Sequence, residues 1–156
     1  MKKVQIHRFV GEPSKKTGCW QATVLIGEGA NRRSVTCHPH REGGILVGNN
    51  PDPTTIRRRD QAARVLANAS ATYERIAGEI TLFEKLLKRE LTEKELETFR
   101  LQGVSTEVQA KVTVKEKVIP TLKIQLFSAR KAVEKAQAFQ AEVNAAYPLT
   151  VEFVGI

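Results

Sequence analysis

The sequence lacks long apolar segments and contains few cysteine residues. It has no run of about 18 apolar residues, so we expect no membrane-spanning helix and no membrane partner. Cys19 and Cys37 are too few for the disulfide framework of a small secreted domain. No apolar stretch follows the lysines near the N-terminus, which argues against a secretory signal. These absences predict a cytoplasmic location.

Aromatic residues are also scarce, at 6% of the 156 residues with a single tryptophan. The hydrophobic content of 41% is nevertheless enough for a core, and the charged content of 27% is that of an ordinary globular protein. No Ser-His-Asp pattern, paired-carboxylate site or dinucleotide-binding glycine fingerprint is legible. The composition therefore predicts a folded protein, and the lack of a catalytic motif favours a binding protein over an enzyme.

Alternating apolar and polar residues predict β-strands in the first third of the chain and at its end. The segments 2–10, 19–26 and 32–37 alternate with period two, and the turn segments 11–18 and 27–31 separate them. A short fourth strand is predicted at 45–47. The segment 149–154 alternates again, and we expect it to return to the same sheet.

Helical periodicity dominates the middle of the chain. Asp52 and Pro53 form a favourable N-cap and first helical position, and a helix is predicted from there to about Leu91. Two sets of apolar residues recur every seven positions along it: Leu66, Tyr73, Ile80 and Leu87, and Ala62, Ala69, Ile76 and Phe83. The residues 92–95 form a capping box that begins a short helix, and Ser105 is the predicted cap of the next one.

A second apolar seam extends from Val108 to Val143 and predicts another long helix. Pro120 opposes a continuous helix, and residues 106–118 also fit a strand, so the sequence leaves both readings open for this segment. The helical reading gives two long helices of matching length.

The predicted class is therefore α+β: a small N-terminal antiparallel β-sheet, joined by the C-terminal strand, plus a long antiparallel helical hairpin. The predicted boundaries are a basic β unit at 1–50, a hairpin or coiled-coil region at 51–147 and a returning strand at 148–156. The two seams offer more apolar surface than one pairing consumes, which predicts a homo-oligomer, most simply a dimer.

The net charge of +8 is concentrated near the N-terminus of the sequence. Residues 1–60 hold 11 basic and 5 acidic residues. Three consecutive arginines in the first turn of a helix oppose the helix dipole, which suggests a function such as binding phosphate. The predicted anion-binding residues are Arg32, Arg33, Arg41, Arg57, Arg58 and Arg59. Phe9 and Trp20 are the aromatic residues nearby, a sparse platform for stacking bases. The alternative is that the charge serves solubility alone.

A cluster of cysteine and histidine residues gives a second candidate site. Cys37, His38 and His40 are consecutive apart from a proline, and a hairpin centred near residue 28 would place Cys19 almost opposite Cys37. Thiolate and imidazole are ligands that zinc prefers, but the spacing matches no established ligand pattern. We therefore expect no metal and no other cofactor, with zinc as the alternative.

The leading functional hypothesis is a non-enzymatic, self-associating binding protein. Its basic β unit and the start of its first helix would engage an anionic partner: a nucleic acid, a nucleotide or an acidic protein surface. The first alternative is a structural assembly or adaptor subunit built on the helical hairpin. The second is a metal-dependent enzyme that cleaves phosphodiesters with the Cys/His cluster.

Overall fold

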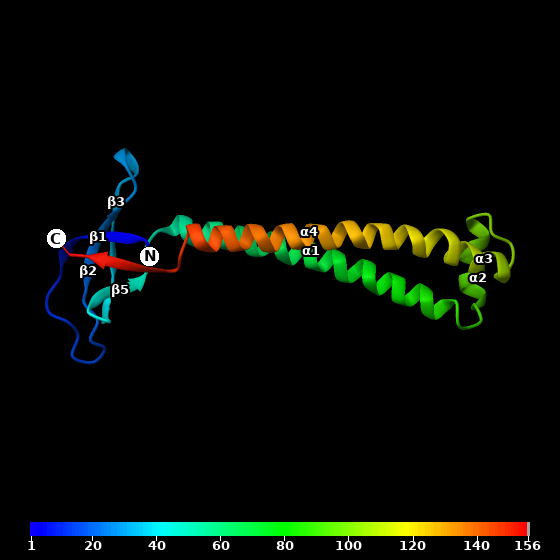
Figure 1. Ribbon diagram of the computed structural model, residues 1–156, viewed down its shortest axis with the longest axis horizontal. Helices are drawn as coiled ribbons and strands as arrows, with labels where there is room; N and C mark the ends of the chain where they lie inside the picture. The colour runs from blue at the N-terminus through cyan, green and yellow to red at the C-terminus, as the bar shows by residue number, and fades with distance from the viewer. Residues whose placement is uncertain (156) are drawn as a thin grey trace. The chain divides into compact units, whose positions relative to one another are not determined.

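A computed structural model describes residues 1–155 and divides the chain into two compact units (Figure 1). The sheet unit comprises residues 1–63 and the chain from Phe139 onward, and the helical unit comprises Arg64–Ala138. The helices α1 (Pro53–Leu86) and α4 (Ile119–Ala146) each contribute to both units. The class is therefore α+β, with a helical hairpin, as the sequence predicts.

The sheet unit holds one curled sheet of six strands in the order β3-β2-β1-β6-β5-β4. The strands are β1 (Lys3–Phe9), β2 (Ala22–Ile26), β3 (Arg33–Cys37), β4 (His40–Glu42), β5 (Ile45–Asn49) and β6 (Thr150–Val154). A 3₁₀ turn, η1 (Gly29–Asn31), lies between β2 and β3. The sequence analysis found the segments of five strands but did not predict β4.

The pairs among the N-terminal strands are antiparallel as predicted, but the sheet is larger than predicted, and the returning C-terminal strand makes it mixed. β6 pairs in parallel with β1, while its other neighbour, β5, is antiparallel to it. The C-terminal strand returns as expected, but it is inserted between β1 and β5 and not added at an edge. Period-two alternation identifies a strand but not its partner or direction, and this is why the parallel pair was missed.

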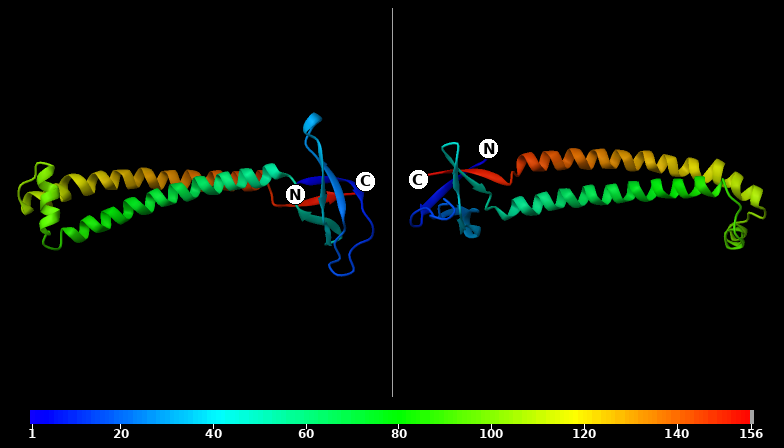
Figure 2. Two further views of the ribbon diagram at one scale, coloured as in Figure 1. Left: turned by 180° about the vertical axis from the view of Figure 1, so that it is seen from behind. Right: turned by 90° about the horizontal axis from the view of Figure 1, so that it is seen from below.

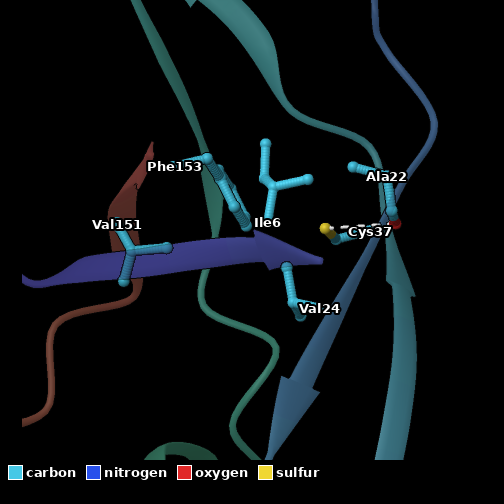
Figure 3. Close-up of a cluster of buried hydrophobic side chains, with 6 residues drawn as sticks. All are labelled: Ile6, Ala22, Val24, Cys37, Val151 and Phe153. Atoms are coloured by element: carbon cyan, nitrogen blue, oxygen red, sulfur yellow. Dashed lines mark hydrogen bonds between the residues drawn. The ribbon is translucent and has the colours of Figure 1, made fainter. Parts of the chain in front are cut away.

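The core of the sheet unit consists of alternate side chains from these strands (Figure 3). Ile6, Val24 and Val151 are completely or almost completely buried, and Phe153 lies beside them. At Gly48 in β5 a Cβ atom would lie 2.9 Å from the Phe153 ring and 3.4 Å from the Cα of Pro39. Because His40 pairs with Val47, the β4–β5 register places Pro39 beside Gly48, a position that only glycine fills without displacement.

The β2–β3 hairpin has a register that differs from the predicted one. Ala22, and not Cys19, pairs with Cys37, and Ile26 pairs with Arg33 at the other end. Gly27 has a φ of +87°, and a Cβ there would lie 2.5 Å from the carbonyl oxygen of Asn31. Only glycine fits this position of the turn, and the pairing is shifted by three residues from the hairpin that the sequence suggested.

The helix α1 begins where the sequence predicts. The Asp52 carboxylate accepts a hydrogen bond from the Thr54 backbone N–H at 3.0 Å. The helix ends at Leu86, about one turn before the predicted end, because tertiary packing overrides the local preference. Leu91 is buried in a cluster with Leu86 and Val114, and its N–H donates to the Glu107 carboxylate.

The structure resolves the open reading of residues 106–118 as a helix that begins at Glu107. α2 (Glu93–Leu101) has the predicted capping box, in which the Thr92 hydroxyl and the Glu95 side chain cap each other's backbone N–H groups. α3 (Glu107–Thr113) continues through a π-helical segment, η2 (Val114–Val118), into α4. Thr106, and not Ser105, caps α3.

The π-helical segment directly precedes Pro120, the residue that argued against a continuous helix. A proline removes one backbone donor and crowds the preceding turn, and a local widening of the helix accommodates both effects. Ile119, next to the proline, keeps α-helical angles of −62° and −46°. The helix therefore passes the proline without a break.

In the helical unit, α1 and α4 lie side by side, as the two further views also show (Figure 2). One cluster centres on Ile76, Ile80, Leu122 and Ala129. A second one, around Val114 and Leu86, includes side chains from α2 and the α2–α3 connection. The two seams predicted from the sequence therefore pack against each other within the chain. No helix among residues 1–155 has both the length and the apolar character needed to cross a bilayer.

An ion pair connects the start of α2 to the end of the preceding loop. The Arg89 guanidinium donates to both Glu95 carboxylate oxygens at 2.7 and 2.9 Å. This pairing, together with the Thr92 backbone N–H, lowers the pKa of Glu95 to about 2. Glu95 is therefore ionised at neutral pH and serves as part of the capping box.

We predict that Ile80→Glu unfolds the helical unit. Ile80 is only 7% exposed within the α1–α4 cluster, so a carboxylate there would be desolvated without a partner, which costs about 3 kcal/mol or more. Far-UV circular dichroism during heating measures the effect. Leu82→Glu is the matched control, because Leu82 on the same helix is 67% exposed and should tolerate the change. Equal loss of stability in the two variants would contradict the assigned core.

Candidate functional site

The six predicted anion-binding arginines lie in three places within the sheet unit. Arg32 and Arg33 lie at the turn end of the β2–β3 hairpin, Arg41 lies in β4, and Arg57–Arg59 are in the first turns of α1. All except Arg59 are classed as exposed. At one end of β2, Ile26 pairs with Arg33. Trp20 precedes the other end of β2, and its ring lies beneath the Arg41 guanidinium. Six residues at about 3.3 Å each put these two ends roughly 20 Å apart.

Arg59 has a structural role. Its guanidinium donates hydrogen bonds to the carbonyl oxygens of Asn144 at 3.3 Å and Tyr147 at 3.0 Å. These carbonyls are at the C-terminal end of α4, where backbone acceptors have no partner within the helix and where a cation is favourable. Arg59 therefore caps the end of α4.

This contact also accounts for cations at the start of α1. The N-terminal turns of α1 lie beside the C-terminal turns of α4 in the sheet unit, and the two helix ends carry opposite partial charges. The repulsion between the arginines and the dipole of α1 is thus offset by the dipole of α4. Arg57 and Arg58 are exposed and remain available to an anion.

The sheet unit brings Arg41 together with two aromatic residues. The Arg41 guanidinium carbon lies 6.0 Å from the centre of the Trp20 ring. Trp20 and Phe9 have ring centres 5.3 Å apart at an interplanar angle of 59°. Trp20 is half-buried, whereas Phe9 is 37% exposed. We call these three residues the aromatic–arginine cluster.

The cluster forms where the β2–β3 pairing continues toward β4. Ala22 pairs with Cys37, and two residues further on the backbone N–H of Trp20 donates to the Pro39 carbonyl oxygen at 2.7 Å, two residues before Arg41. Phe9 ends β1, and the Val10 N–H donates to the Gln21 carbonyl, which extends the β1–β2 pairing up to Trp20. The sequence indicated Phe9 and Trp20 as nearby aromatic residues but did not predict the contact between Trp20 and Arg41. The hairpin register around the 11–18 turn was the signal that could have paired the two aromatic residues.

Further basic residues lie next to the cluster along the chain. Lys15 and Lys16 are exposed in the loop between Val10 and Cys19, and this loop is closed by a hydrogen bond from the Ser14 N–H to the Cys19 carbonyl. Arg8 in β1 is exposed as well. Glu12 and Glu42 are the nearby acidic residues along these segments, so the local balance is basic.

The charge asymmetry of the sequence does not persist between the units. With α4's last turns and β6 included, the sheet unit holds 11 basic and 7 acidic residues, a net +4, and the helical unit holds 14 and 10, also +4. Glu142 and Glu152, from the C-terminal part of the chain, make the difference. The net charge therefore does not distinguish the sheet unit from the helical unit, and a site in the sheet unit depends on the local arrangement of its residues.

The Cys/His residues do not form a ligand set. The Cys37 thiol points into the core and contacts the Ala22 carbonyl oxygen at 3.5 Å, and burial raises its pKa (Figure 3). His38 is exposed, and His40 lies 3.5 Å from the Glu42 carboxylate. Within residues 1–155, no three or more His, Cys, Asp or Glu side chains come close enough together to hold a metal ion. A buried, protonated thiol is a poor metal ligand and a poor nucleophile.

Comparison with protein-family models, with curated proteins and with solved structures gives no match to this chain.

We predict that Arg59→Ala destabilises the sheet unit by about 1–2 kcal/mol, because two carbonyl groups at the end of α4 lose a charged donor. Thermal or chemical denaturation measures the difference. Arg58→Ala, an adjacent and exposed position, should change the stability by less than about 0.5 kcal/mol. Equal effects at the two positions would show that the run of arginines acts through its charge and not through this contact.

Proposed function

We propose that this protein is a non-enzymatic binding protein whose sheet unit engages a single-stranded nucleic acid. The observation that carries this proposal is the aromatic–arginine cluster of Phe9, Trp20 and Arg41. Aromatic rings and guanidinium planes offer stacking surfaces to unpaired bases, while neighbouring cations attract the phosphates. Lys15 and Lys16 supply such cations.

A single strand suits this surface better than a duplex. The bases of a duplex are stacked on each other and leave no face for Phe9 or Trp20, whereas an unpaired base has two free faces. The exposed part of Phe9 and the outer face of the Arg41 guanidinium are the groups that an incoming base would contact. Arg57 and Arg58 could continue the phosphate contacts at the start of α1.

The two other anionic partners to consider are a free nucleotide and an acidic protein surface. A free nucleotide would use one stacking contact and few cations, so its affinity would be low and depend little on salt. An acidic protein surface would have no need of the aromatic pair. The cluster therefore favours the nucleic acid among the three anionic partners.

We predict that an oligothymidylate quenches the fluorescence of Trp20, the single tryptophan of the chain. Phe9→Ala or Arg41→Ala should each weaken binding about tenfold, the effect of one lost stacking contact. With roughly three phosphate contacts, the affinity should fall about 20-fold between about 50 and 200 mM salt. Arg33→Ala is the matched control, since it removes the same charge about 20 Å away, where no aromatic residue pairs with the arginine.

An equal loss of binding in Arg33→Ala and Arg41→Ala would contradict a stacking site and indicate a diffuse charge effect. Stronger loss in Arg57→Ala and Arg58→Ala than in Phe9→Ala would move the site to the start of α1. Absence of binding to any single-stranded oligonucleotide at low salt would remove the proposal and favour a structural adaptor.

Self-association is a separate proposal, and the seams cannot provide the interface because they pack within the chain. The exposed apolar residues of the α2–α3 segment, Leu101, Val108 and Val112, offer one surface for a second copy. Light scattering at tens of micromolar should then give twice the chain mass of 17.4 kDa. Leu101→Ser with Val108→Ser should restore the monomer without loss of helix. A monomeric wild-type protein would contradict this proposal.

A further inference from the structure

The outer side of α4 carries two large apolar side chains that do not belong to the core. Ile124 and Phe127 are 70% and 62% exposed, and Pro120 lies one turn before them on the same side. The core contacts of this helix come from Leu122, Leu126 and Ala129 instead. Ile124 and Phe127 are therefore not needed to hold α4 against α1.

Cations surround these two apolar side chains. Residues 117–135 contain five exposed basic residues and one acidic residue, Glu134, and Glu116 precedes the segment; the basic residues are Lys117, Lys123, Arg130, Lys131 and Lys135. The Lys131 ammonium lies 4.9 Å from the centre of the Phe127 ring. Glu134 is offset by Arg130, whose Nε lies 3.8 Å from its carboxylate. We call this surface of residues 117–135 the α4 stripe.

The charge of the α4 stripe argues against a second copy of the same chain as its occupant. In an antiparallel two-fold pairing centred between Ile124 and Phe127, Lys117 of one copy would lie opposite Glu134 of the other, but Lys123, Arg130 and Lys131 of each copy would have no acidic side chain opposite them. Like charges across an interface are unfavourable, and a symmetric pairing offers few acidic side chains to offset them.

An anionic membrane fits the charge but not the apolar width. A helix that lies in a lipid interface buries a broad apolar face along its length. The α4 stripe offers Ile124 and Phe127 with Pro120, and its other positions are charged or small. Ile124 and Phe127 lie in one row with basic residues on both sides. This is the contact pattern that a single helix packed against α4 would require.

We propose that the α4 stripe docks an amphipathic helix of another protein whose apolar residues are flanked by acidic side chains. The apolar ridge of this helix packs on Ile124 and Phe127. Its acidic residues pair with the surrounding lysines, which sets the orientation and the choice of partner. This site lies in the helical unit and is independent of the nucleic-acid proposal.

The test uses the full chain and two labelled peptides of about 20 residues. The peptides share a leucine stripe at i, i+3, i+4 and i+7, and are flanked by glutamates in one and by lysines in the other. Fluorescence anisotropy should show binding of the glutamate peptide and no binding of the lysine peptide. Phe127→Ser should weaken the binding at least tenfold, and circular dichroism should confirm that the exposed substitution leaves the fold intact.

Two further variants make the result specific. Leu82→Ser, an equally exposed apolar residue of α1, should leave the affinity unchanged. The double charge reversal Lys123→Glu with Lys131→Glu should weaken binding of the glutamate peptide and allow the lysine peptide to bind. This exchange of preference would show that the flanking charges determine the partner.

Several results would overturn the proposal. Equal binding of the two peptides, an equal loss in Leu82→Ser, or no binding of the glutamate peptide would each exclude an acidic helix as the occupant. Retention on phosphatidylserine vesicles that Phe127→Ser abolishes, without peptide binding, would assign the stripe to a membrane. A mass that falls from dimer to monomer in Phe127→Ser would assign it to a second copy.

Discussion

The position of β6 between β1 and β5 is the constraint on which the sheet unit depends. Without β6, the strands β1–β3 and β4–β5 are two separate antiparallel groups with no ladder between them. β6 pairs with both groups and adds Val151 and Phe153 to the core. Because β1 and β6 are at opposite ends of the chain, this parallel pairing requires closure of the longest loop in the protein, which favours late formation of the sheet.

The connections into and out of the helices are held beside each other for the same reason. The Asn50 side chain donates to the Pro148 carbonyl oxygen at 3.2 Å and to the Thr55 hydroxyl at 2.9 Å, and the Asn50 N–H donates to the Leu149 carbonyl at 2.7 Å. One turn further on, Arg59 reaches the end of α4. The strands β5 and β6 thus place the start of α1 and the end of α4 together, and side-chain hydrogen bonds satisfy the backbone groups there.

The sequence predicted those parts of the fold that local chemistry determines. Alternation located β1, β2 and β6, the Asp52–Pro53 pair located the start of α1, and the Thr92 capping box located α2. Features that depend on contacts between distant segments were missed: the parallel partner of β6, β4, and the register that puts Ala22 opposite Cys37. Local patterns carry no information on which strand lies next to which.

The same division applies to the candidate sites. Arg59 was grouped with Arg57 and Arg58 because the three are consecutive, but its partners are about 85 residues further along the chain. Arg41 was assigned to an anion site as a charge, whereas its contact with Trp20 depends on the β2–β3 register, which places Trp20 opposite Pro39. Residue type therefore indicated the chemistry available in the chain, and the sheet decided which groups could act together.

The distribution of apolar residues on α4 is the clearest case in which stability and function separate. The heptad pattern assigned Leu122, Leu126 and Ala129 to the seam, and these residues do pack against α1. Ile124 and Phe127 are not part of that pattern and gain nothing from the hairpin, since they are largely exposed. An exposed aromatic side chain adds to the tendency of a protein to aggregate unless a partner covers it. In the proposed docking site, the lysines around it would disfavour unselective apolar contacts and favour an acidic surface, so the residues that the fold does not use would be those that a partner recognises.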